Sequence, residues 1–149
     1  MPRTVVQSAH LPATPSKLYA MYLDPDQHAS FTGGGPARIA AKVGTDWSAF
    51  EGRIHGLVLS LVPDRMIVQS WRSFEWEEGD LDSILVLSFW PEREGTRIEL
   101  TQANVPDRLY RTLVSGWPTR YWEPWRSFLK KFTTEAQRAC PERSEGTPR

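Results

Sequence analysis

An aromatic stretch near the C-terminal end constrains the fold most strongly. Residues 116–132 read Gly-Trp-Pro-Thr-Arg-Tyr-Trp-Glu-Pro-Trp-Arg-Ser-Phe-Leu-Lys-Lys-Phe. With helical spacing, one face carries a mainly aromatic set: Val114, Trp117, Tyr121, Trp125, Phe128 and Phe132. The opposite face carries polar residues: Arg120, Glu123, Ser127, Lys130 and Lys131. The stretch therefore predicts an amphipathic helix that needs a broad apolar partner.

The partner that the sequence offers is a β-sheet. Apolar and polar residues alternate in six runs that are separated by turns containing Gly, Pro or Asp: 37–41, 46–51, 53–62, 65–73, 81–90 and 96–104. Such short connections require antiparallel neighbours. Residues 3–10 read as an additional first strand. We therefore expect a curved antiparallel sheet of about seven strands around the long helix.

Two short helices are predicted between the first strand and the rest of the sheet. Thr14 and Asp24 are each followed by a proline, which combines an N-cap side chain with the residue preferred at the first helical position. The fold class is therefore α+β. We expect one domain over residues 3–132 and a disordered tail over residues 133–149, where apolar residues are few. Pro124 is expected to kink the long helix.

Composition excludes several classes of function. The formal net charge is +0, which gives no electrostatic reason to bind nucleic acid or an anionic membrane. A single cysteine, Cys140, rules out an internal disulfide. The 3 histidines lack the spacing of metal ligands, so we expect neither a metal nor a cofactor. No apolar run approaches the length of a membrane span and no signal peptide is evident, so we expect a cytoplasmic protein.

Alternation along the strands predicts a face that meets the helix. We assign the odd-numbered apolar residues from Leu57 to Leu61, together with the matching sets on the next three strands, to this concave face. The predicted ligand-binding residues are Phe50, His55, Leu57, Leu59, Gln69, Trp71, Trp76, Leu85, Leu87, Leu100, Gln102, Trp117, Tyr121 and Trp125. These residues would form an apolar pocket with a few polar points. A completely filled core is the alternative, and the residues alone leave both open.

The opposite face of the sheet is also apolar on three consecutive strands. Its predicted outward residues are Val58, Met66, Val68, Ile84, Val86 and Trp90. A monomer would expose them to water as one patch of several hundred Å². We therefore predict a homodimer in which two sheets pack face to face about a two-fold axis.

Several ordered motifs resemble one family. Residues 24–33 read Asp-Pro-Asp-Gln-His-Ala-Ser-Phe-Thr-Gly, and residues 47–52 read Trp-Ser-Ala-Phe-Glu-Gly. With residues 61–63, 67–72, 95–97, 105–106 and 116–124, they are similar to the activator of heat-shock-protein-90 ATPase, C-terminal-domain type. The resemblance covers about residues 3–132. It implies a START-like or birch-allergen-like (SRPBCC) helix-grip domain with a cavity between helix and sheet. Gln102 departs from the pattern, since relatives often have His there.

Three functions follow as hypotheses. The first is non-enzymatic binding of a hydrophobic or aromatic small molecule, which the cavity implied by the resemblance favours. The second is a protein-interaction or chaperone-associated role of the outer sheet face. The third is an enzyme of the polyketide cyclase or aromatase type. Such an enzyme needs convergent ionisable groups in the cavity, and only His55 and Glu51 are candidates.

Overall fold

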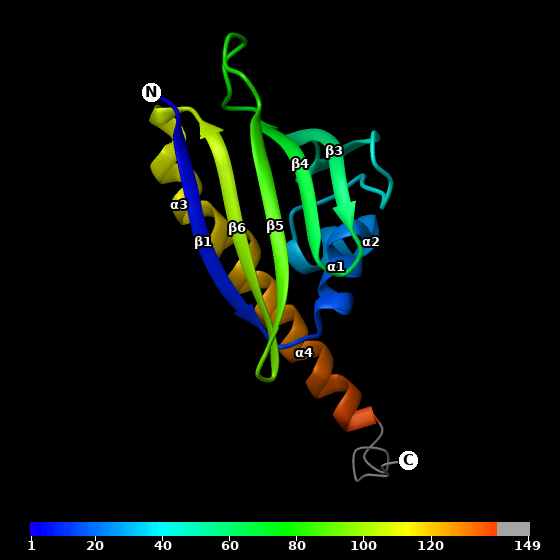
Figure 1. The fold of residues 1–149 in the computed structure, drawn as a ribbon. Helices are drawn as coiled ribbons and strands as arrows, with labels where there is room; N and C mark the ends of the chain where they lie inside the picture. Colours follow the sequence, from blue (N-terminus) through cyan, green and yellow to red (C-terminus); the bar gives the residue numbers. More distant parts are fainter. Residues whose placement is uncertain (140–149) are drawn as a thin grey trace.

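The computed structural model describes the backbone of residues 1–139 and the side chains of residues 1–131 (Figure 1). Six strands form one antiparallel sheet in the order β1-β6-β5-β4-β3-β2. Their bounds are β1 Arg3–Leu11, β2 Asp46–Ala49, β3 Ile54–Val62, β4 Met66–Ser73, β5 Ser83–Glu92 and β6 Gly95–Val105. The predicted α+β helix-grip fold is confirmed. The sheet has six strands instead of about seven, because segment 37–41 contributes only an isolated bridge between Arg38 and Ser48.

Two short helices follow β1, as predicted. They are α1 (Pro15–Leu23) and α2 (Pro25–Thr32). The side chain of Thr14 accepts a hydrogen bond from the backbone N–H of Lys17, and that of Asp24 accepts one from the backbone N–H of Gln27. Each cap satisfies a backbone donor that a helix end would otherwise leave free. In Figure 1 the pair lies behind β3 and β4.

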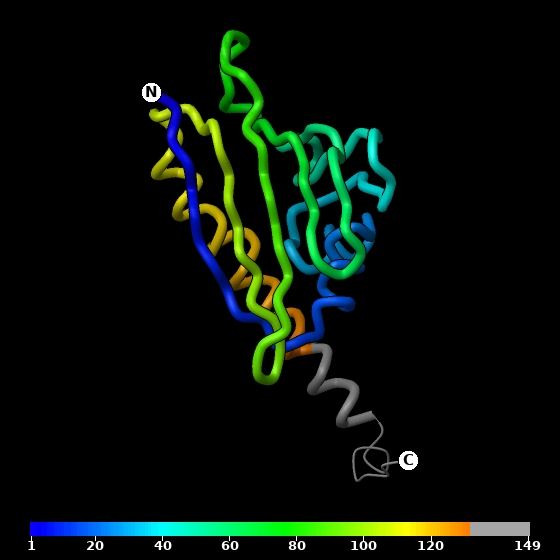
Figure 2. Tube along the Cα trace, in the orientation of Figure 1, coloured from blue at the N-terminus to red at the C-terminus, as the bar shows by residue number. Residues whose placement is uncertain are grey.

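A long helical segment crosses one face of the sheet behind β1, β6 and β5 (Figure 1). It comprises a 3₁₀ turn, η1 (Asp107–Leu109), then α3 (Tyr110–Trp117), a π-helical turn, η2 (Pro118–Trp122), and α4 (Glu123–Ala139). Pro118 opens the π-helical turn and Pro124 lies in the first turn of α4. Because proline has no backbone N–H to donate, the irregularity of the helix falls at these two residues. The tube runs on from α3 into α4 (Figure 2). Helix α4 continues past the predicted boundary at residue 132, and residues 140–149 lie outside the described part.

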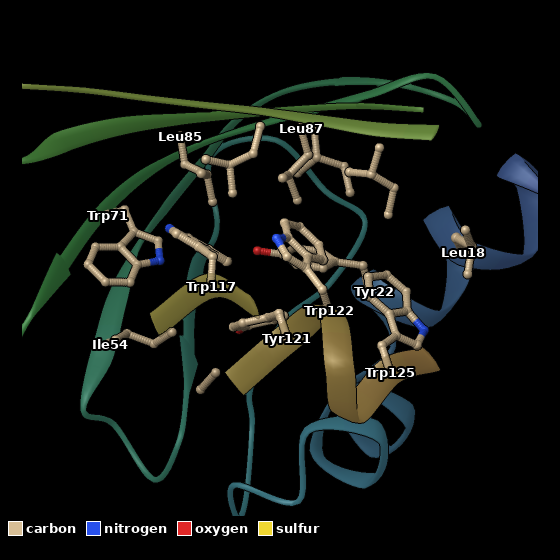
Figure 3. Close-up of a cluster of buried hydrophobic side chains, with 14 of the residues drawn as sticks. Leu18, Tyr22, Ile54, Trp71, Leu85, Leu87, Trp117, Tyr121, Trp122 and Trp125 are labelled. Atoms are coloured by element: carbon tan, nitrogen blue, oxygen red, sulfur yellow. The ribbon is translucent and has the colours of Figure 1, made fainter. Parts of the chain in front are cut away.

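The helix and the concave sheet face enclose the core. Strands β4, β5 and β6 present the predicted inward residues, and all of these are buried: Ile67, Trp71, Leu85, Leu87, Phe89, Ile98 and Leu100. The helical segment buries Trp117, Tyr121 and Trp125 as predicted, and also Trp122 and Leu129. The extra pair widens the buried face at ordinary helical spacing, since Trp122 and Leu129 lie three residues before and four residues after Trp125. Figure 3 shows the indole and phenol rings meeting leucines of the sheet.

The predicted facing of β3 was wrong. Ile54 and Val58 are buried, whereas Leu57 and Leu59 are 42% and 40% exposed. The pairing of β3 with β4 shifts between Val58 and Ser60. Such an irregularity breaks the two-residue alternation, so the three leucines of this strand cannot share one face.

Candidate functional site

A cavity of about 180 Å³ lies between α3, η2 and the part of the sheet formed by β3 and β4. Its walls are mainly apolar and aromatic. The lining residues are Phe50, Arg53, Ile54, Trp71, Ser73, Phe74, Glu75, Thr112, Leu113, Gly116, Trp117, Arg120 and Tyr121. Arg53, Phe74 and Arg120 are exposed, whereas Trp71, Trp117 and Tyr121 are buried. The cavity therefore has a charged mouth and an aromatic floor.

Four of the predicted ligand-binding residues meet in this cavity: Phe50, Trp71, Trp117 and Tyr121. Six others are buried in the core away from its lining: Gln69, Leu85, Leu87, Leu100, Gln102 and Trp125. The sequence left two alternatives open, an apolar pocket and a completely filled core. Each describes part of the interior, since the first group of residues surrounds a cavity and the second group lies in the filled core. Figure 3 places Ile54, Trp71, Trp117 and Tyr121 around one side of the cluster.

Three predicted site residues lie on the opposite face of the sheet. His55, Leu57 and Leu59 are exposed on β3, as a consequence of the facing described above. His55 pairs with Arg72 across the strands. The prediction that His55 and Glu51 could converge inside the cavity is therefore wrong, since neither residue lines it.

Trp76 folds inward from the β4–β5 loop. Its ring packs edge-on against Trp71 with centroids 5.5 Å apart, and its Nε1 donates to the carbonyl of Leu81 at 3.0 Å. Arg108 forms an ion pair with Asp80 in the same loop and holds the pKa of that carboxyl below its usual range. Trp76 therefore supports the wall residue Trp71 from behind, outside the cavity lining.

A chain of hydrogen bonds links the indole of Trp117 to the backbone of Trp71. Trp117 Nε1 donates to Gln102 Oε1 at 2.9 Å, and Gln102 Nε2 donates to Ser83 Oγ at 3.0 Å. Ser83 Oγ in turn donates to the backbone carbonyl of Trp71 at 2.6 Å. Gln102 is fully buried, so its side-chain amide makes its hydrogen bonds to other residues of the wall. Preorganised rings of this kind lower the entropic cost of binding a flat molecule.

A second buried network lies behind Tyr121. His28 Nδ1 lies 2.7 Å from the carbonyl of Tyr22 and so carries the proton, because a carbonyl only accepts. His28 Nε2 then accepts from the hydroxyl of Tyr121 at 2.8 Å. Burial lowers the pKa of His28 to about 4, against a smaller opposing effect of the Tyr22 carbonyl. Burial also raises the pKa of Tyr121, so both groups are neutral near pH 7.

One of the residues that line the cavity has a buried indole nitrogen without a partner. Among the residues that the structure describes, three buried side-chain nitrogens lack a hydrogen bond: Gln69 Nε2, Trp71 Nε1 and Trp125 Nε1. Only Trp71 of these three lines the cavity. Its nitrogen edge turns towards Trp117 in Figure 3. The nitrogen atom is itself buried, so this donor is a cost of about 1–3 kcal/mol to the folded protein, and a molecule in the cavity does not reach it without movement of the wall.

Several residues of the site were not predicted from the sequence. Arg53, Leu113, Gly116 and Arg120 line the cavity, and His28 supports it. Gly116 interrupts an otherwise helical pattern, which is a signal for close packing or open space beside a helix. Arg120 was placed on the polar face of the helix, where charged side chains are ordinary.

Two further features were looked for among the described residues: a metal-binding cluster and a helix that could span a membrane. Within residues 1–139, no group of three His, Cys, Asp or Glu side chains is arranged to hold a metal ion. Over the same part of the chain, the helices are too short or too polar to cross a bilayer.

A curved antiparallel sheet that grips a long C-terminal helix, with a cavity between them, defines the helix-grip class of protein. Within that class, residues 12–130 match the family model described as Activator of Hsp90 ATPase homolog 1-like protein. The chain belongs to this family.

Known proteins agree with this assignment. The human activator of 90 kDa heat shock protein ATPase homolog 1 is 27% identical over 110 residues, which are 74% of this chain and 32% of that protein. The chain thus spans about a third of the length of this relative. An HSP90 activator from Plasmodium falciparum superposes with a TM-score of 0.76 at 23% identity, covering 85% of this chain and 96% of that one. The Aha1 dimer from Colwellia psychrerythraea superposes with a TM-score of 0.64 at 16% identity, covering 77% and 87%.

Proposed function

We propose that the protein binds a small apolar or aromatic molecule in the cavity under α3, without transforming it. The observation that carries this proposal is the cavity of about 180 Å³ with Trp71, Trp117 and Tyr121 as its floor. An apolar cavity of about 150 Å³ in another protein binds benzene, so this one has room for one substituted ring. The aromatic floor offers stacking and edge contacts to such a ring.

A non-catalytic role fits the chemistry of the lining. The ionisable side chains of the lining are Arg53, Glu75, Arg120 and Tyr121. The two guanidinium groups stay protonated, and the Tyr121 hydroxyl already donates to His28. A proton-transfer enzyme needs an acid or a base whose pKa lies near the working pH. Glu75 is the single remaining candidate of this lining, which disfavours the cyclase or aromatase alternative.

Filling the cavity tests the proposal. Gly116 lines it, and a Cβ at this position would meet nothing within 4 Å. Gly116→Leu should occupy the space and abolish binding of ethylbenzene, followed by chemical-shift changes of the tryptophan indole N–H groups. Ser115→Leu, on the exposed side of the same helix, is the matched control and should bind as wild type does. Absence of any ethylbenzene binding to the wild type would reject the proposal.

A second candidate function is self-association through the outer sheet face. Four side chains on this face are large, apolar and substantially exposed: Leu57 42%, Leu59 40%, Ile84 37% and Trp90 38%. Met66, Val68 and Val86 lie among them and are half-buried. The helices cover the other face of the sheet, so this face has no partner within the described chain (Figure 1). Val58 leaves the predicted interface, because it is fully buried.

We propose that a second copy covers this face. The Colwellia relative is described as a dimer, which is a precedent within the fold. Light scattering on the wild type should report a dimer at high micromolar concentration, and Val86→Lys should shift it to a monomer. Glu99→Lys, an exposed position on the neighbouring strand β6, controls for added positive charge at the edge of the patch. A monomeric wild type would remove this candidate.

The chaperone-associated alternative rests on the names of relatives. The human relative is named as an activator of the 90 kDa heat shock protein ATPase, and this chain matches 32% of it. Stimulation of the ATPase activity of a purified Hsp90 by this chain, lost in Val86→Lys, would favour that role over self-association. The cytoplasmic location expected from the sequence remains a prediction.

A further inference from the structure

We infer that Phe50 determines the size of the ligand that the cavity accepts, and that Gly34 positions the Phe50 ring. This inference rests on the proposed binding function and names the residues that give it specificity. Three observations carry it: the place of the ring in the lining, the backbone conformation of its turn, and the close approach of Gly34 to the ring.

The Phe50 ring is the aromatic wall of the cavity that lies at the margin of the core. Trp71, Trp117 and Tyr121 are buried, whereas Phe50 is half-buried and follows β2 in a turn. Its ring packs on Tyr121 in a T-shaped arrangement, with centroids 5.8 Å apart. Tyr121 is itself fixed by its hydrogen bond to His28. The Phe50 ring can therefore be removed without opening the centre of the core, and the space that it leaves adjoins the cavity.

The turn between β2 and β3 holds Phe50 in an unusual backbone conformation. Phe50 and Glu51 have φ angles of 54° and 59°, in the left-handed region that residues with a Cβ rarely adopt. The N–H of Gly52 donates to the carbonyl of Ala49, and that of Arg53 donates to the carbonyl of Phe50, both at 3.1 Å. Strained residues persist where the surrounding structure fixes them, and they are frequent at ligand sites. Glycine would adopt this conformation more easily, yet the position carries a large ring that lines the cavity.

Gly34 gives the ring its place, although it does not line the cavity itself. A Cβ at Gly34 would overlap Cδ1 and Cε1 of the Phe50 ring. The φ angle of Gly34 is not positive, so the obstacle to a side chain here is the ring and not the backbone of Gly34. The carbonyl of Pro36 accepts a hydrogen bond from the N–H of Glu51 at 3.1 Å, which fixes this segment to the turn. Gly34 is therefore a positioning residue that acts through Phe50.

The volume of the cavity sets the size limit. About 180 Å³ accommodates one substituted ring, so the second ring of naphthalene needs space that the Phe50 side chain occupies. One surplus methylene in an apolar pocket changes affinity by about tenfold or more. The wild type should therefore bind ethylbenzene about tenfold more tightly than naphthalene, as followed by the chemical shifts of the tryptophan indole N–H groups.

Variants of Phe50 test its role in this preference. Phe50→Ala removes the ring and should bind naphthalene at least as tightly as ethylbenzene, a change of about tenfold in the ratio of the two dissociation constants. Phe50→Gly should give the same change, and it also suits the left-handed backbone, so it preserves the test where the alanine variant folds poorly. Phe74→Ala is the matched control. It removes the same ring from a lining position that is 71% exposed and should leave the ratio unchanged.

A double variant tests whether Gly34 acts through Phe50. Gly34→Ala should displace the ring from its place beside Tyr121 into the cavity and weaken ethylbenzene binding by about tenfold. When it is combined with Phe50→Ala, the clash is gone, so the added Gly34→Ala should have no effect on ethylbenzene binding. A general structural effect of alanine at this position would persist in the double variant.

The outcomes separate this inference from the proposed function. Equal affinities of the wild type for ethylbenzene and naphthalene, or a ratio that stays unchanged in both Phe50 variants, would overturn the inference and leave the proposed function standing. Unchanged ethylbenzene binding in Gly34→Ala, or a loss that persists beside Phe50→Ala, would overturn the role of Gly34. Failure of the wild type to bind either probe would reject both the inference and the proposed function.

Discussion

The hydroxyl of Tyr121 donates a hydrogen bond of 2.8 Å to Nε2 of His28, a residue 93 positions earlier in the chain. This bond joins the long helical segment to α2, and both residues are almost fully buried. Tyr121 lines the cavity while His28 lies behind it, stacked on Phe31 with centroids 5.2 Å apart. A neutral imidazole thus holds a wall residue of the proposed binding site, and its protonation would break that contact.

The first prediction concerns the pH dependence of stability. The pKa of His28 is lowered from 6.5 to about 4 in the folded protein. Above pH 6.5 the imidazole is neutral in both states and the stability is complete. As the pH falls from 6.5 to 4, the unfolded state binds a proton that the folded state refuses. The free energy of unfolding should therefore fall by about 1.4 kcal/mol per pH unit, reaching a loss of about 3 kcal/mol.

His28→Gln removes this titration while keeping an amide that can donate and accept. In urea unfolding between pH 7 and pH 4, the free energy of unfolding of this variant should depend less on pH than that of the wild type. The difference should correspond to the uptake of about one proton on unfolding. His55→Gln is the control, because His55 is exposed on the outer sheet face. Equal pH dependence in His28→Gln and the wild type would contradict the assignment.

A second prediction concerns the aromatic face of the helix. Trp125 is fully buried and stacks on Phe31, with centroids 4.0 Å apart and planes within 7°. Trp125→Ala should lower the free energy of unfolding by about 3–5 kcal/mol, the usual cost of removing a large buried aromatic side chain. Lys131→Ala, at an exposed position of the same helix, should change it by less than about 0.5 kcal/mol. Similar losses in both variants would show that the helix does not pack as described.

The third prediction tests the network in the cavity wall. Gln102 accepts from Trp117 Nε1 and donates to Ser83 Oγ. Gln102→Leu keeps the volume but leaves the buried indole N–H without an acceptor, which should cost about 1–3 kcal/mol in thermal or chemical unfolding. Thr101→Val, one residue away on the outer face, removes a hydroxyl from a half-buried position and should cost less. An unchanged Gln102→Leu protein would mean that this bond contributes nothing to stability.

Local signals were strong enough to predict most of the fold. Proline after Thr14 and after Asp24 specified two helix starts, and both caps are present. Strict alternation on β4, β5 and β6 gave the correct facing, because these strands pair without irregularity. The aromatic period of the helical segment placed Trp117, Tyr121 and Trp125 in the core correctly.

The facing of β3 could not be predicted in the same way. Leu57, Leu59 and Leu61 suggest a single inward face, but a register shift between Val58 and Ser60 divides the strand. Such a shift depends on contacts with the neighbouring strand, which the local pattern does not contain. The charged mouth was missed for a similar reason. Arg53 and Arg120 line the same cavity only because the fold brings a turn before β3 and a π-helical segment, which are distant in the chain, to its walls.

The last prediction tests the packing that accompanies the irregular pairing of β3. A Cβ at Gly56 would overlap the backbone carbonyl of Ser70 on β4, and Ser70 Oγ accepts a hydrogen bond from the neighbouring backbone N–H of Leu57. Neither a carbonyl in a sheet nor its neighbours can move away without losing ladder hydrogen bonds.

Gly56→Ala should therefore destabilise the protein by about 1–3 kcal/mol or more in chemical unfolding, although alanine is otherwise no worse than glycine in a strand. Gly79→Ala is the matched control, since a Cβ at Gly79 in the β4–β5 loop would meet nothing within 4 Å. Because Ile54 and Trp71 of these two strands line the cavity, Gly56→Ala should also weaken binding of ethylbenzene, whereas Gly79→Ala should not. A Gly56→Ala protein as stable as the wild type would show that β3 and β4 lie further apart than described.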